Sequence, residues 1–170
     1  MVLLLNKNKK KIRREIKYGE NMDINSLYGL VDRENINIID TYLENTNGMY
    51  LNYNKIKAIV LDYKNFETSI NEKCVLAEEL GHYYMDATYP ASTTYKDKEL
   101  IDKQEYRAKK WSYYILVPFE NLKEAIQSGI TTIYELAEYF EVTIEYMKNC
   151  VNFYNSKYRK GKLLCLLNIL

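Results

Sequence analysis

Histidine is almost absent from this chain, whose 170 residues include only His82. A zinc site built from several histidines is therefore excluded, and any metal centre would have to use mostly oxygen ligands. Cysteine is also scarce, with three residues at widely separated positions: Cys74, Cys150 and Cys165. Their odd number and wide spacing exclude a disulfide framework and a CxxC metal knuckle, and favour the reducing cytoplasm.

Long apolar runs are missing as well. The stretches at 2–5 and 163–170 are far shorter than the roughly 20 residues that cross a bilayer, so no membrane segment is expected. Positive charge is concentrated in residues 1–20, where seven Lys and Arg outnumber two Glu, although the whole chain carries a net charge of +1. The rest of the chain is mildly acidic, which gives no general reason to expect binding to nucleic acid.

The composition, 47% hydrophobic and 28% charged, is that of a soluble globular protein. Residues 1–21 form a basic leader. Gly19 and Glu20 can be encoded by a purine-rich ribosome-binding sequence, so Met22 is a second candidate start and the leader need not belong to the native protein. We expect one domain over residues 22–158 and a C-terminal tail over 159–170.

Residue patterns in the first half predict a small sheet between helices. A short helix begins near Asn25, and three segments rich in strand formers follow at 36–43, 49–53 and 56–62, which we interpret as a three-stranded antiparallel sheet. Ser69 and Glu72 have the spacing of a capping box, which predicts a helix that runs to about Met85.

The second half reads as helical throughout. After a loop at 86–100, a long helix is expected over 101–116, where Pro118 stops it. Three shorter helical patterns fill the remainder to residue 158. The fold class is therefore α+β, with the sheet and the helices sharing one core.

The segment LAEELGHYY, residues 76–84, places Glu78, Glu79 and His82 within one stripe of its predicted helix. Glu78 and His82 are four residues apart and could ligate the same ion, with Glu79 beside them to take a proton from water. A solvated, charged helix face explains the same spacing. Gly81 is costly in mid-helix, which indicates that another element packs closely there.

The next predicted helix carries Glu105 on the same face as Ala108, Ser112 and Leu116. A carboxylate on such an inward face needs an ion pair, a shifted pKa or a metal. Two alternatives remain open: stabilisation by the helix dipole at the first turn, or a pair with Lys109.

Three stretches, CVLAEELGHYY, EYRAKKWSYYILVP and YELAEYFEVTIEYM, together resemble the ImmA/IrrE family of metallo-endopeptidases from phages and mobile elements, over roughly residues 24–158. The resemblance implies a zincin-like helical core, with Glu79 as general base and His82 and Glu105 as metal ligands. Glu78 stands where the family's HExxH motif has its first histidine, giving the altered motif EExxH. One divalent ion is implied, zinc first, and manganese or iron as alternatives because of the added carboxylate.

The function implied by the resemblance is cleavage of a phage or mobile-element repressor of the helix-turn-helix type. The alternative is a catalytically inactive pseudo-peptidase that binds a repressor or another regulatory partner. Residues 134–149 themselves resemble a helix-turn-helix, but the second helix offers a single cation near its groove-facing end, Lys148, so direct DNA binding is not expected.

Overall fold

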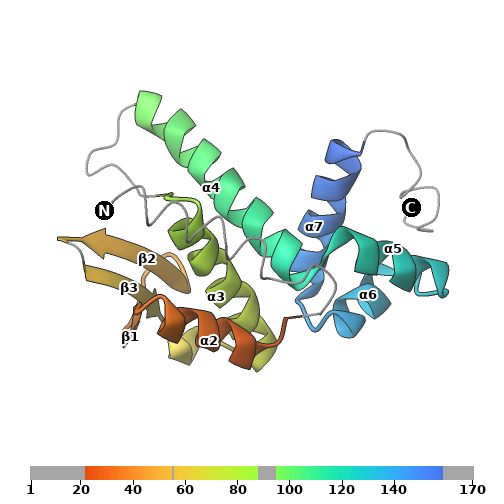
Figure 1. Cartoon of the computed structure of the whole chain (residues 1–170), viewed down its shortest axis with the longest axis horizontal. Coiled ribbons are helices and arrows are strands. Elements are labelled where there is room, and N and C mark those ends of the chain that lie inside the picture. Colours follow the sequence, from red (N-terminus) through yellow and green to blue (C-terminus); the bar gives the residue numbers. More distant parts are fainter. Residues whose placement is uncertain (1–21, 55, 88–94, 159–170) are drawn as a thin grey trace.

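A computed structural model describes residues 22–54, 56–87 and 95–158, and Figure 1 shows their arrangement. The predicted leader 1–21, the predicted tail 159–170 and residues 88–94 of the predicted loop lie outside the described residues. The elements in chain order are α2 (Ile24–Arg33), β1 (Asn37–Asp40), β2 (Gly48–Tyr53), β3 (Ile56–Leu61), the 3-10 turn η1 (Tyr63–Asn65), α3 (Ser69–Tyr84), α4 (Tyr95–Leu116), α5 (Phe119–Gln127), α6 (Ile133–Tyr139) and α7 (Ile144–Lys157). The predicted α+β class is confirmed.

The sheet is mixed, so the prediction of a purely antiparallel sheet is wrong. Strands β2 and β3 pair antiparallel, but β1 pairs with β3 in parallel, in the order β1-β3-β2. The chain between β1 and β2 crosses the end of β3, where the Leu43 backbone N–H donates to the buried Asp62 carboxylate at 3.0 Å and the Asp62 N–H donates to the Asn47 carbonyl. This crossing places the most apolar strand in the centre.

Helix α3 begins where the sequence predicts, with a different cap. Its N-cap is Thr68, whose hydroxyl accepts a hydrogen bond from the Asn71 backbone N–H. Glu72 does not complete a capping box with Ser69 and accepts instead from the Tyr28 hydroxyl of α2. The helix start is therefore tied to α2 by a side-chain contact across the core.

Helix α4 begins at Tyr95, six residues before the predicted start, and packs along α3 (Figure 1). The closest approach is at Gly81: a Cβ added there would lie 2.4 Å from the carbonyl oxygen of Ala108. The close packing that Gly81 predicted is thus present. The two helices touch backbone to backbone, which only glycine allows at this point.

The C-terminal helices pack against the end of α4. The Tyr146 hydroxyl of α7 donates to the buried Ser112 hydroxyl at 2.9 Å, and the Tyr154 hydroxyl donates to the Val117 carbonyl at 2.7 Å. The segment that resembles a helix-turn-helix, α6 with α7, therefore contributes buried side chains to the core. Across the described part of the chain, no helix has the length and apolarity to cross a membrane.

The contact at Gly81 predicts a matched pair of stability changes. Gly81→Ala should lower the free energy of unfolding by about 1–3 kcal/mol, because the new methyl group collides with a backbone carbonyl that cannot move aside easily. Gly29→Ala in α2, where an added Cβ meets nothing within 4 Å, should raise it by up to about 1 kcal/mol. Urea unfolding of both variants measures this, and an equal effect at the two sites would contradict the close contact.

Candidate metal centre

Helices α3 and α4 bring His82 and Glu105 together. His82 Nε2 lies 3.4 Å from Glu105 Oε1, with the imidazole almost fully buried and the carboxylate about one-third exposed. Two ligands of one tetrahedral zinc ion, each about 2.0–2.2 Å from the metal, lie roughly 3.3 Å from one another. The pair therefore has the separation that two ligands of a single ion require.

The protonation state of His82 also suits a ligand. Burial lowers the pKa of His82, against the opposing effect of the Glu105 carboxylate. The imidazole is thus held toward its neutral form, which is the form that binds metals. On distance and on chemistry, His82 and Glu105 fit a divalent ion.

Glu79 lies between α3 and the edge strand β2. Its side chain is 8% exposed, and the backbone of Tyr50 lowers its pKa against the effect of burial. Burial, with the charge of Glu78 adding to it, raises the pKa of Glu79 to about 8. A Cβ added to Gly48 of β2 would lie 3.1 Å from Glu79 Cγ, so the glycine gives this side chain its room.

Glu78 has a different neighbourhood. It lines a cavity of about 230 Å³ together with Lys109 of α4 and Glu145 of α7. Burial raises the pKa of Glu78 to about 7, and the ammonium of Lys109 opposes that rise. His82 and Glu105 are not part of the lining of this cavity.

The predicted site residues are thus only partly assembled. The structure joins His82 with Glu105, whereas in the described ranges no group of three or more His, Cys, Asp or Glu side chains is arranged to hold a metal. Of the alternatives for Glu105, the first-turn position is wrong, because α4 begins ten residues earlier at Tyr95.

Three residues that shape the site were not predicted to do so. The sequence predicts Lys109 only as a possible partner of Glu105, yet its charge also acts on Glu78 and Glu79. Gly48 and Tyr50 come from a strand, and nothing in their local sequence shows that β2 packs beside Glu79. Of these three residues, only Lys109 could have been linked to the site from the sequence, because it lies four residues after Glu105 on the same helix face.

Comparison with known proteins identifies one family. The family model described as the IrrE N-terminal-like domain of a peptidase family matches residues 31–151, well over half of the chain. This range contains α3, α4 and all four of the candidate site residues. Comparisons with curated proteins and with solved structures find no match.

The buried carboxylates predict that stability depends on pH. The pKa values of about 8 for Glu79 and about 7 for Glu78 stand above the ordinary 4.5, so the folded protein holds these protons more tightly than the unfolded chain does. Their contribution to stability is complete below pH 4.5 and is lost as the pH rises through about 8.

Glu79→Gln removes one of these protonation sites. In metal-free protein the variant should become progressively more stable than wild type as pH rises, by at least about 1 kcal/mol at the alkaline end. Urea unfolding at several pH values measures the difference, with the exposed Glu138→Gln as a control expected to show none. A wild-type to variant difference that is constant with pH would contradict the burial of an ionisable Glu79.

Proposed function

The chain belongs to the peptidase family of the IrrE N-terminal-like domain, and on this premise we propose that it is a metal-dependent endopeptidase. The observation that carries the proposal is the separation of 3.4 Å between His82 Nε2 and Glu105 Oε1. It links the two central helices at a distance suited to a shared ion. The family model, which describes a peptidase family, covers both residues of that pair.

In this proposal His82 and Glu105 hold one divalent ion, and Glu78 supplies the third ligand after a rotation of its side chain. Zinc is the expected metal, with manganese or iron as alternatives because two of the three ligands are carboxylates. When bound, the ion supplies Lewis-acid polarisation of the peptide carbonyl and lowers the pKa of water.

Glu79 is the proposed general base. Its carboxylate takes a proton from the attacking water and returns it to the leaving amine of the cleaved peptide bond. Burial beside β2 raises the pKa of Glu79 to about 8, so its ionised carboxylate is a stronger base than that of a free glutamate. The backbone of Tyr50 on β2 favours the ionised form of this carboxylate.

The proposed substrate is a protein of the helix-turn-helix repressor type from a phage or mobile element, and the proposed compartment is the reducing cytoplasm. The cavity beside Glu78 lies next to the catalytic residues and is lined by polar side chains, including Lys109 and Glu145. Its volume of about 230 Å³ suits one side chain of such a substrate.

One observation favours the alternative of an inactive pseudo-peptidase that binds a repressor or other partner. Glu78 shares its cavity with Lys109, whose ammonium already acts on both glutamates of α3. A fixed ammonium can balance these carboxylates without a metal. The same surface would then recognise a partner without cutting it.

Metal analysis separates the two functions. Wild-type protein purified without chelators should carry about one equivalent of zinc, manganese or iron, and Glu105→Gln should lose most of it because one ligand is removed. Glu99→Gln, exposed on the same helix and paired with Lys103, is the matched control and should keep its metal. Wild-type protein that neither carries nor takes up any of the three metals would contradict the peptidase proposal.

Cleavage of a helix-turn-helix repressor from a phage or mobile element tests the role of Glu79. In a cell-free assay Glu79→Gln should lower the rate of cleavage at least about 10²-fold, because the general base is lost. Its metal content should equal that of wild type, since Glu79 is not a proposed ligand. Cleavage that survives in the variant would show that another group acts as the base.

A further inference from the structure

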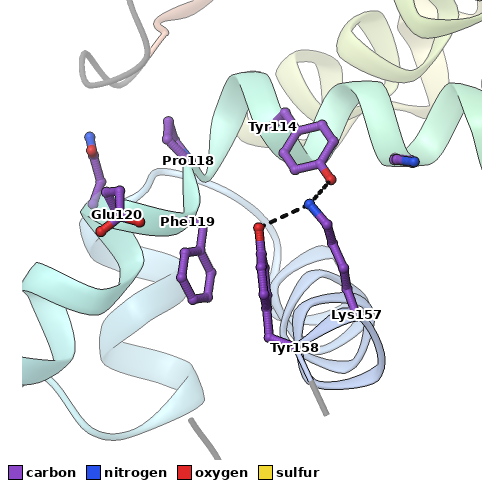
Figure 2. A pocket seen from close by; sticks show the side chains of 8 residues that line it. Tyr114, Pro118, Phe119, Glu120, Lys157 and Tyr158 are labelled. Atoms are coloured by element: carbon purple, nitrogen blue, oxygen red, sulfur yellow. Dashed lines mark hydrogen bonds between the residues drawn. The ribbon is translucent and has the colours of Figure 1, made fainter. Parts of the chain in front are cut away.

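A second cavity, of about 520 Å³, lies where α4 ends, α5 begins and α7 ends (Figure 2). It shares no lining residue with the cavity at Glu78 and contains none of the candidate site residues. Its volume falls within the roughly 300–1,000 Å³ that small-molecule sites occupy. The proposed peptidase function makes no use of it.

One cation is fixed at this cavity by aromatic side chains. Lys157 Nζ donates to the Tyr114 hydroxyl at 2.5 Å and to the Tyr158 hydroxyl at 2.9 Å, as the dashed lines in Figure 2 mark. The same ammonium lies 4.8 Å from the ring centroid of Tyr114 and 4.6 Å from that of Tyr158. The two hydroxyls use two of its three N–H donors, which leaves the third for an acceptor in the cavity.

Aromatic rings form the adjoining wall. The Phe119 and Tyr158 ring centroids are 4.3 Å apart, with an angle of 30° between the ring planes, and Figure 2 shows the Tyr158 ring between Phe119 and Lys157. One face of Tyr158 is therefore turned to Phe119, and Phe119 and Pro118 supply the apolar surface of the lining. The side chain of Asn121 also lines the cavity and carries both hydrogen-bond donors and an acceptor.

The charge at the cavity is positive. Lys110 and Lys157 both line it, whereas the one lining carboxylate, Glu120, lies 3.7 Å from the ammonium of Lys123 outside the cavity. Two ammonium groups match a phosphate monoester, which carries nearly two negative charges at neutral pH, better than they match a single carboxylate. A flat ring attached to such a phosphate would find apolar surface at Phe119 and Pro118.

We propose that this cavity binds a small phosphorylated compound with an aromatic ring system, of which a nucleoside monophosphate is the simplest example. The phosphate accepts from Lys157 and Lys110, and the ring lies along Phe119. Because the lining comes from three helices that meet at the end of α4, an occupant would hold the C-terminal helices together.

Calorimetric titration of the full chain with AMP, GMP, CMP and UMP tests the proposal. At least one nucleotide should bind saturably, and the matching nucleoside and inorganic phosphate should each bind at least tenfold more weakly. Lys157→Gln and Phe119→Leu should each weaken binding at least tenfold. Lys148→Gln, an exposed lysine elsewhere on α7, should leave it unchanged.

Several results would overturn the proposal. These are no binding of any of the four nucleotides at millimolar concentration, equal binding of inorganic phosphate alone, or an equal loss in Lys148→Gln and Lys157→Gln. Lys157 is exposed, so its variant should fold, and a melting curve for each variant checks this. The titration needs neither metal nor peptidase activity, so its outcome is independent of the proposed function.

Discussion

The arrangement of the candidate centre depends on one backbone contact, that of Gly81 with Ala108. The two helices meet where a methyl group on Gly81 would lie 2.4 Å from a carbonyl oxygen, so no larger residue fits without moving them apart. His82 follows Gly81 directly, and Glu105 lies one helical turn before Ala108. The imidazole and the carboxylate therefore approach each other as a consequence of how closely α3 and α4 pack, and the 3.4 Å between them is set by that contact.

The same packing concentrates charge where it is costly. Of two adjacent glutamates of α3, Glu79 is buried and Glu78 is half-buried, and desolvation raises the pKa of each. A chain optimised for stability alone would place neutral side chains there. Shifted titrations combined with specific charged neighbours are typical of functional sites, although ion-pair networks can produce them too. The ammonium of Lys109 acts on both glutamates and offsets part of their negative charge.

The sequence predicted features that depend on local periodicity. The inward face of α4 and the close approach at Gly81 are present, because spacing along a helix determines which residues share a face. The order of the strands in the sheet was not predictable, because the alternation of apolar and polar side chains along a strand does not show which other strand pairs with it. Glu78 shows the limit most clearly: its spacing from His82 permits a shared ligand role, yet local spacing could not show that Lys109 of α4 and Glu145 of α7 line a cavity with it.

The parallel pairing of β1 with β3 also constrains how the sheet can assemble. Strands β2 and β3 are consecutive and antiparallel, so that hairpin can form from local contacts alone. Strand β1 pairs with residues about 21 positions further along the chain, and the segment after it must first cross the end of β3 and bond to Asp62. Closing that longer loop has an entropy cost that the hairpin does not. The β2–β3 pair therefore closes at low entropy cost, with Tyr53 only three residues from its partner Ile56, whereas β1 depends on contact between distant parts of the chain.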